Sequence, residues 1–405
     1  MQKKLITLAI AGALAIPGAA MADVGAASGS DITIYGKFHA SWDYVDNGAT
    51  VAGNDDSDDN SAVFRNSRLG FKGAEDVGSG IKAIWQVETD LKTGNSNDAA
   101  GNMELRNTFV GLQGDNWGTI FMGKHDTPYK TATAKLDIFS DTIADYNNII
   151  GSHMNALNAF GSAVYAAGSA GARQQTFNAR PNQVVAYETP NFNGFKGQLA
   201  RASIQSPDVL TEETEAWSAM GMYDQGPFFA SLAYEVYSGA AGTTGAAGNP
   251  AGGGNVTSPN KEKIDAWKVG LGYTFGNSSL GFVYEDIGHD DDAAGAAPLR
   301  ASRDAFWLGA SHKFGANVVK LAYGKADDSD ANNNDGADNW SIGVDHNFSK
   351  RTKVYAIYTD MDNDTNANYA LNSEDGASAY APGQTATGNT GGDVSAFSVG
   401  IIHSF

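Results

Sequence analysis

Apolar and polar residues alternate along most of this chain with a period of two, which is typical of β-strands that have one apolar face. In residues 80–91, every second position from Ile81 to Val87 is apolar, whereas Gln86 and Glu88 on the other face are polar. The pattern recurs in about sixteen segments, near the strand number of large membrane barrels. The predicted strands are 31–38, 63–73, 80–91, 103–114, 118–126, 182–190, 195–205, 214–224, 227–238, 263–275, 278–287, 304–314, 317–326, 338–348, 352–360 and 393–405.

The connections between these segments alternate between two lengths. Tight turns such as 224–227 and 275–277 follow every second strand, whereas the intervening connections, such as 239–261 and 361–392, are long and polar. A soluble sandwich has no reason to segregate loop length in this way, but outer-membrane barrels have short turns at one end and long loops at the other. The alternation therefore predicts an all-β fold, a transmembrane antiparallel β-barrel that forms one domain over residues 23–405.

The last predicted strand ends on an aromatic residue. Residues 393–405 alternate up to Phe405, with apolar side chains on one face. A barrel closes when its last strand pairs with its first and turns its apolar face to lipid. We therefore expect Phe405 to act as an assembly signal at the closing strand.

The first 22 residues have the pattern of a cleaved signal peptide. Lys3 and Lys4 precede an apolar run over 5–16, and Ala20 and Ala22 flank a small-residue cleavage site. The apolar run is about a dozen residues, shorter than the roughly 20 that a membrane-spanning helix needs. We expect cleavage after Ala22, export, and a location in the outer membrane.

Composition removes several classes of function. The chain has 0 Cys, so it has neither disulfides nor thiolate metal sites, and its net charge of −19 argues against a nucleic-acid partner. The seven histidines show no metal-ligand spacing, and no serine lies in a nucleophile elbow. The sequence therefore predicts no catalytic residue, no metal site, no cofactor and no enzymatic activity.

Residues 54–60 are an acidic stretch that admits more than one interpretation. They lack the glycine and the terminal glutamate of an EF-hand calcium loop. The alternatives to a specific calcium site are a solvated acidic loop, or a loop that binds lipopolysaccharide through divalent cations.

Several motifs together resemble the Gram-negative general porin family, in a type found in β-proteobacteria. The resemblance covers essentially the whole mature chain, and the second-strand and terminal motifs are its most specific parts. The motifs are 32–37 (ITIYGK), 67–80 (SRLGFKGAEDVGSG), Arg106 with 110–112 (VGL), Gly118, 123–124 (GK), 187–195 (YETPNFNGF) and 400–405 (GIIHSF).

The resemblance implies a sixteen-stranded barrel, a homotrimer, and passive diffusion of small hydrophilic solutes across the outer membrane. It also implies that the third extracellular loop, residues 127–181 here, folds into the lumen as a constriction loop. This is the longest connection of the chain, and loops of this length in compact domains are usually functional. Lipid and lipopolysaccharide of the outer membrane are the other expected partners.

A constriction with opposite charges on opposing walls creates a transverse field that orients dipolar solutes. Strand parity and the resemblance predict an inward-facing basic wall of Lys37, Arg68, Arg106 and Lys124. On the loop, Asp137, Asp141 and Asp145 recur every four residues, which on a helix would place their carboxylates on one face. The alternative is a solvated helix face that contacts Lys130 and Lys135.

Glu188 departs from the family, which often has a further basic wall residue at that position. This substitution and the acidic loops favour a weak cation preference. The sequence therefore predicts a general diffusion porin. A solute-specific channel of the same fold and an outer-membrane adhesin or structural barrel remain as alternatives.

Overall fold

The computed structural model describes residues 22–23, 30–48, 57–91, 103–151, 177–203, 215–240, 261–290, 302–330, 334–367, 369–372 and 391–405. Within this part of the chain the secondary structure is almost entirely antiparallel strand. No helix in the described ranges is both long enough and apolar enough to cross a bilayer. Most of the predicted signal peptide lies outside the described residues.

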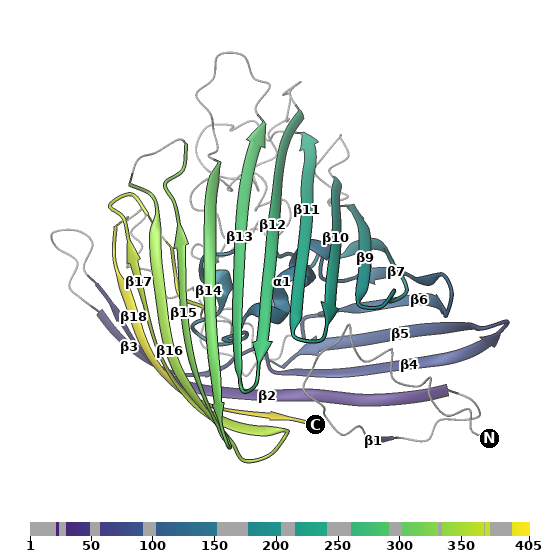
Figure 1. Cartoon of the computed structure of the whole chain (residues 1–405), viewed down its shortest axis with the longest axis horizontal. Helices are drawn as coiled ribbons and strands as arrows, with labels where there is room; N and C mark the ends of the chain where they lie inside the picture. The colour runs from purple at the N-terminus through teal and green to yellow at the C-terminus, as the bar shows by residue number, and fades with distance from the viewer. Residues whose placement is uncertain are drawn as a thin grey trace.

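The strands form one closed antiparallel sheet. Neighbours in sequence pair from β4 to β18, β18 pairs with β2, and β9 pairs with β10, so that the ring has no open edge. Figure 1 shows the strands following one another around the barrel, with the C-terminus beside β2. Because β3 and β4 are two parts of one interrupted strand and β1 is a two-residue bridge, the barrel has sixteen strands, as predicted.

The strand bounds agree with the sequence pattern at most positions. The first strands are β1 (Ala22–Asp23), β2 (Ser30–Asn47), β3 (Ser57–Phe64), β4 (Arg68–Gly78), β5 (Ile81–Asp90), β6 (Thr108–Gly114), β7 (Gly118–Lys124), β8 (Gln183–Glu188) and β9 (Phe195–Ser203). The others are β10 (Glu215–Gln225), β11 (Phe228–Ala240), β12 (Lys261–Phe275), β13 (Ser278–Asp290), β14 (Arg303–Phe314), β15 (Asn317–Ala326), β16 (Ala337–Asn347), β17 (Thr352–Asn363) and β18 (Val394–Ser404).

Three predicted strands differ clearly from the structure. The segment 31–38 is only the first part of β2, which continues to Asn47. The segment 63–73 is interrupted at residues 65–67, where Asn66 has a φ of +43°, so β2 pairs first with β3 and then with β4. The segment 103–114 becomes continuous strand only at Thr108, and Leu105 forms an isolated bridge with Thr89. Both irregularities lie beside charged side chains of the interior.

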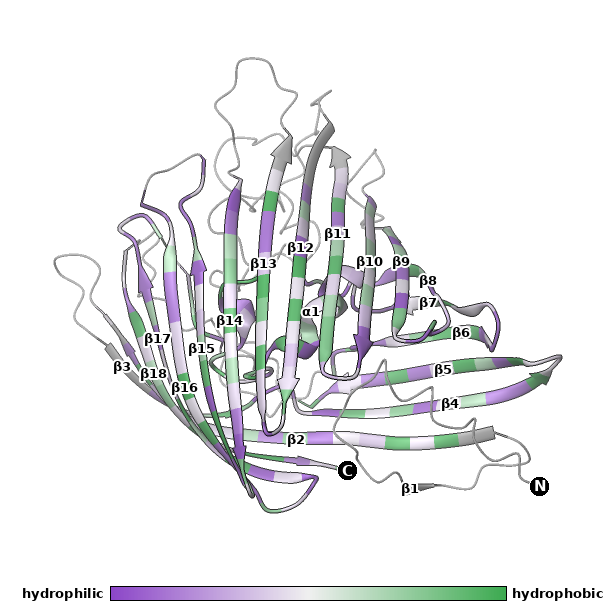
Figure 2. Ribbon diagram, in the orientation of Figure 1, coloured by the Kyte–Doolittle hydropathy of each residue, from purple (hydrophilic) through white to green (hydrophobic). Residues whose placement is uncertain are grey.

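Alternation along the strands separates an apolar outer face from a polar inner face. In β16, Trp340, Ile342 and Val344 are exposed, whereas Ser341 and Asp345 are buried. Figure 2 shows this change of hydropathy along the strands. Exposed apolar residues on the outside and buried polar residues inside are the arrangement of a barrel that faces lipid.

The two ends of the barrel differ as the sequence predicted. Short turns at 79–80, 226–227 and 276–277 lie at one end, and all the long connections leave the other end. Large aromatic side chains are exposed next to the short turns, among them Phe275, Phe314 and Phe348. Such a band suits the interface between lipid and water.

Phe405 completes the closure of the barrel next to β2. Its backbone N–H donates to the Gly36 carbonyl at 3.1 Å, and its carbonyl accepts from the Gly36 N–H at 3.1 Å. The Phe405 ring lies so close to Gly36 that a Cβ at this glycine would stand 2.3 Å from the ring. Its centroid is 5.7 Å from that of Phe38.

We predict that deletion of Phe405 lowers the yield of folded, heat-modifiable barrel in outer membranes. The deletion removes two backbone hydrogen bonds, worth about 0.5–1.5 kcal/mol each, and the ring contact with Gly36 at the closing seam. Semi-native gel electrophoresis of outer membranes measures the yield. Phe348→Ala, which truncates an exposed aromatic at another turn, is the control; equal yields of the two variants would contradict an assembly role.

Candidate functional site

Residues 127–151 follow β7 and contact the inner faces of strands on the far side of the barrel. They begin with α1 (Pro128–Thr133), where the Thr127 side chain accepts a hydrogen bond from the Lys130 N–H at 3.3 Å. A proline at the first helical position and a threonine cap are strong start signals for a helix. Tyr129 is fully buried, and its N–H donates to the Ser218 hydroxyl of β10 at 2.9 Å.

Glu285, on the inner face of β13, holds both ends of this segment. Its carboxylate accepts from the Tyr129 hydroxyl at 2.7 Å and from the Gly151 N–H at 2.8 Å. Arg303 of β14 donates to the Ile149 carbonyl at 3.0 Å and also contacts Glu285. The wall therefore satisfies polar groups that a backbone enclosed in a barrel would otherwise leave unpaired.

The middle of the segment returns to the opposite side of the barrel through the Asp141 carboxylate. This group forms an ion pair with Lys37 of β2 and lies 3.0 Å from the Arg68 guanidinium of β4. The Asn66 amide donates to it at 2.8 Å. Burial alone would raise the pKa of Asp141, but the nearby positive charges of Lys37, Arg68 and Arg106 hold it well below its usual range.

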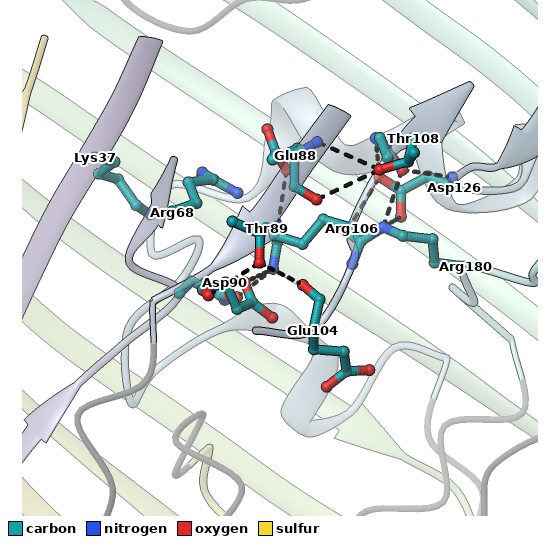
Figure 3. Close-up of polar contacts among 12 residues, drawn as sticks. Lys37, Arg68, Glu88, Thr89, Asp90, Glu104, Arg106, Thr108, Asp126 and Arg180 are labelled. Atoms are coloured by element: carbon teal, nitrogen blue, oxygen red, sulfur yellow. Dashed lines mark hydrogen bonds and ion pairs between the residues drawn. The ribbon is translucent and has the colours of Figure 1, made fainter. Parts of the chain in front are cut away.

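Arg106 forms a second group of contacts next to the first. Its guanidinium donates to Glu88 at 2.8 Å, to Asp90 at 2.9 Å and to the side-chain amide oxygen of Asn66 at 2.7 Å. Asn66 therefore bridges Arg106 and Asp141. Figure 3 shows Arg106 in the centre of this region, with Lys37 and Arg68 to one side.

Asp126 and Arg180 extend the charged region on its other side (Figure 3). The Asp126 carboxylate lies 3.0 Å from both Arg180 and Lys130. Burial opposes its charge, but these two cations hold the pKa of Asp126 well below its usual range. Both ends of the long connection 125–182 thus join the same network.

The cations and carboxylates at the core of the network are equal in number. Lys37, Arg68 and Arg106 face Asp141, Glu88 and Asp90, and each cation lies within an ion pair. Such an arrangement offers closely spaced charges of both signs to ions and dipolar solutes, with no net charge of its own.

The three loop aspartates do not share a helix face, which corrects the expectation from their spacing. After η1 (Ala134–Leu136) the chain turns, and Asp141 has a φ of +63°. Asp137 accepts from the Phe139 and Tyr146 N–H groups, whereas Asp145 accepts from the Asp141 and Asn147 N–H groups and caps η2 (Tyr146–Asn148). Asp141 contacts the basic wall, and Asp137 and Asp145 shape the turn that presents it.

Two further predicted residues lie apart from this group. Lys124 is the last residue of β7 and follows Gly123, whose φ of +146° interrupts the strand's alternation; its ammonium lies 3.8 Å from Glu104. Its place on the inner wall stays a prediction. Glu188 is at the end of β8, close to a short turn, and pairs with Lys196 at 3.6 Å. Neither contacts Asp141.

The sequence pattern did not predict Asn66, Glu88, Asp90 or the residues that anchor the segment to the wall as part of the site. Glu88 and Asp90 do lie on the polar face of the predicted strand 80–91, so their inward direction was available as a signal. The anchors Glu285, Arg303 and Lys320 give no local signal, because their partners are more than a hundred residues away in sequence. No group of three or more His, Asp or Glu side chains in the described ranges could hold a metal ion.

Comparison with known proteins gives consistent matches over the chain. A family model described as Gram-negative porin matches residues 7–366. Outer membrane porin protein 32 of Delftia acidovorans is 30% identical over 413 residues, which cover 100% of both chains. The major outer membrane protein P.IB of Neisseria lactamica is 27% identical over 364 residues, which cover 87% of this chain and 91% of that protein.

Solved structures share the fold. The anion-selective porin from Comamonas acidovorans has a TM-score of 0.72 at 24% identity, covering 93% of this chain and 100% of that chain. The trimer form of OmpT from Vibrio cholerae has a TM-score of 0.62 at 15% identity, covering 93% of this chain and 100% of that chain. Identities this low are evidence for the fold alone.

The lowered pKa of Asp141 leads to a pH prediction with a definite sign. A carboxylate stabilised in the folded state contributes stability above its unfolded pKa and loses it only as the pH falls through its lowered folded pKa. We therefore expect Asp141 to stay ionised at about pH 3.9, where an ordinary aspartate is half protonated. The carboxyl-carbon NMR signal of Asp141, assigned with Asp141→Asn, measures this titration.

Lys37→Met should move that titration upward, toward the ordinary range, because it removes the strongest attraction on the Asp141 carboxylate. Lys82→Met, which removes an exposed lysine of β5, is the matched control. If Asp141 titrates normally in the unmodified protein, or if the two lysine variants behave alike, the ion pair does not hold the carboxylate.

Proposed function

The chain belongs to the Gram-negative porin family, and we propose that it is a general diffusion porin for ions and small hydrophilic solutes. Porins of this family are passive channels rather than enzymes, and the protein is a porin of the outer membrane. From the geometry of the interior we also propose what limits the passage of solutes and which ions are preferred.

The observation that carries the proposal is the path of residues 127–151 across the barrel. Contacts with Glu285 and Arg303 hold one part of the segment to β13 and β14, and Asp141 contacts Lys37 on β2. A segment in contact with both sides of a wet barrel reduces the cross-section open to solutes. This supports the proposal that the loop 127–181 is the constriction; residues 152–176 of that loop lie outside the described part of the chain.

We propose a weak cation preference. The basic side chains that could attract anions are matched by Asp141, Glu88 and Asp90, and the chain as a whole carries a net charge of −19. Acidic residues at the mouth concentrate cations, although salt near 0.15 M screens charges beyond about 8 Å. Anion preference is the alternative, because the solved porin with the same fold from Comamonas acidovorans is described as anion-selective.

A homotrimer in the outer membrane is the proposed assembly. OmpT of Vibrio cholerae, a structure with the same fold, is described as a trimer form. The apolar outer face suits lipid and neighbouring subunits, and the acidic connection that contains residues 54–60 could bind lipopolysaccharide through divalent cations. Cross-linking in native membranes separates a trimer from a monomer.

We predict that shortening the loop between 137 and 160 raises single-channel conductance and admits larger sugars, because the deletion removes residues that we propose narrow the lumen. Conductance in planar bilayers and liposome swelling measure the two effects. An equal shortening within 241–260, in another long connection, is the control. Unchanged conductance and sugar exclusion would show that the loop does not limit passage.

We predict that Asp141→Asn shifts the reversal potential in a salt gradient toward anions, because Lys37 and Arg68 lose their shared counter-charge. The permeability ratio should change by about two- to tenfold, which corresponds to an interaction of roughly 0.4–1.4 kcal/mol between a passing ion and the Asp141 charge. Asparagine tolerates the positive φ of this position, so the turn should persist. Asp330→Asn, an exposed change in another connection, is the control.

An anion-selective unmodified pore would contradict the proposed preference. The absence of any shift in Asp141→Asn would show that other charges control the field. A pore blocked at low concentration by one solute would instead favour the solute-specific channel, and a barrel without conductance would favour a structural role.

A further inference from the structure

We propose that a socket on the inner wall, formed by Lys320, Gly343 and Ile357, receives the Phe139 ring and thereby fixes Asp141 against the basic wall. Gly343 is then a positioning residue for ion selection, although it lies on a different strand from every charged group of the constriction. This inference rests on the proposed function, because it assigns a cause to the position of the constriction loop.

Strand register places the three socket residues side by side. Lys320 of β15 pairs with Gly343 of β16, and Gly343 pairs with Ile357 of β17. Phe139 is fully buried against them. A Cβ at Gly343 would stand 2.7 Å from the Phe139 ring, closer than real side chains pack, and 3.2 Å from Ile357. Only glycine therefore leaves room for the ring.

Lys320 adds a polar side to the socket. Its ammonium lies 4.7 Å from the centre of the Phe139 ring and donates to the Ile138 carbonyl at 3.2 Å. It also lies 2.9 Å from the Asp345 carboxylate, which compensates its charge. A cation over an aromatic face and a hydrogen bond to the preceding residue together fix both the ring and its backbone.

A short, tightly bonded turn connects Phe139 to Asp141. The Phe139 carbonyl accepts from the Thr142 N–H at 3.0 Å, and the Phe139 N–H donates to Asp137 at 2.9 Å. The Asp141 N–H donates to Asp145 at 2.9 Å. Because both sides of the turn are bonded, displacement of Phe139 must also displace Asp141.

Other inner-wall glycines show the same relation to the loop. A Cβ at Gly272 would stand 2.9 Å from Leu136, and one at Gly324 would stand 3.2 Å from Ile149. Glycine inside a strand costs about 0.5–1 kcal/mol relative to alanine, so its presence needs a reason. Gly221 of β10 provides a contrast on the outer face, where it lies on the same side as the exposed Trp217 and pairs with the exposed Leu232, and a Cβ there would meet nothing within 4 Å.

Some wall glycines instead accommodate a side chain of the wall itself. At Gly309 the nearest atoms belong to Trp307, and at Gly400 they belong to Tyr355. These positions serve packing within the barrel. Gly343 differs from them because its nearest atom belongs to the loop, and this difference makes an effect on the loop separable from an effect on the barrel.

The test compares Gly343→Ala with Gly221→Ala, the same change at an open position on the outer face of the barrel. We expect folded barrels from both. In Gly343→Ala the Asp141 carboxyl should titrate near the ordinary value of about 3.9, because it has moved away from Lys37 and Arg68. In Gly343→Ala, the contribution of the Asp141 charge to the reversal potential should also be lost as the pH falls through about 3.9. Gly221→Ala should match the unmodified protein in both measurements.

In the double variant Gly343→Ala/Phe139→Leu, Asp141 should again titrate at the low pH seen in the unmodified protein, because the smaller Leu side chain makes room for the new methyl group. If Gly343→Ala does not fold, Phe139→Ala with Gly343 intact empties the socket from the loop side and should raise the titration in the same way. The inference is overturned if Gly343→Ala leaves the titration of Asp141 low, or if the folded socket variants match Gly221→Ala.

These outcomes are distinguishable from failure of the proposed function. If Asp141→Asn shifts the reversal potential but Gly343→Ala changes neither titration nor potential, the diffusion pore stands and the socket fails. If Asp141→Asn has no effect on the potential, the proposed role of Asp141 fails whatever Gly343 does.

Discussion

The closed ring of backbone hydrogen bonds is the constraint on which the rest of the structure depends. In lipid, every strand needs a partner on both sides, and the pairing of β18 with β2 and of β9 with β10 supplies the last of them. Closure fixes which side chains point inward, because alternation leaves each strand a single polar face. The interior must then accommodate buried charges, and the ion pairs of Arg106, Glu88 and Asp90 do so.

The loop enclosed by this ring is under the same constraint, because its backbone polar groups also need hydrogen-bond partners. Glu285, Arg303 and Lys320 provide them from the wall. The wall also shapes the apolar contacts, since glycines stand where Leu136 and Phe139 approach. Position and charge are thus linked: the contacts that dock the loop on one side of the barrel place Asp141 beside Lys37 on the other.

Local patterns predicted the fold, but only part of the site. A period of two is visible in each strand, so the sixteen strands and the inward direction of Lys37 and Arg68 could be read directly. The spacing of Asp137, Asp141 and Asp145 was misleading, because helical periodicity does not reveal a turn held by side chain to backbone hydrogen bonds. The wall anchors could not be read at all, since their contacts arise only when distant strands close into a ring.

The central claim is that residues 127–151 lie on the inner wall, and a disulfide tests it most directly. The chain has 0 Cys, and a Cβ at Gly324 would stand 3.5 Å from the Ile149 Cβ, within the range for a disulfide. The double variant Ile149→Cys/Gly324→Cys should form this bond in folded barrels under mild oxidation, whereas Ile149→Cys/Gly221→Cys should not. Two free thiols in the folded first variant would contradict the account.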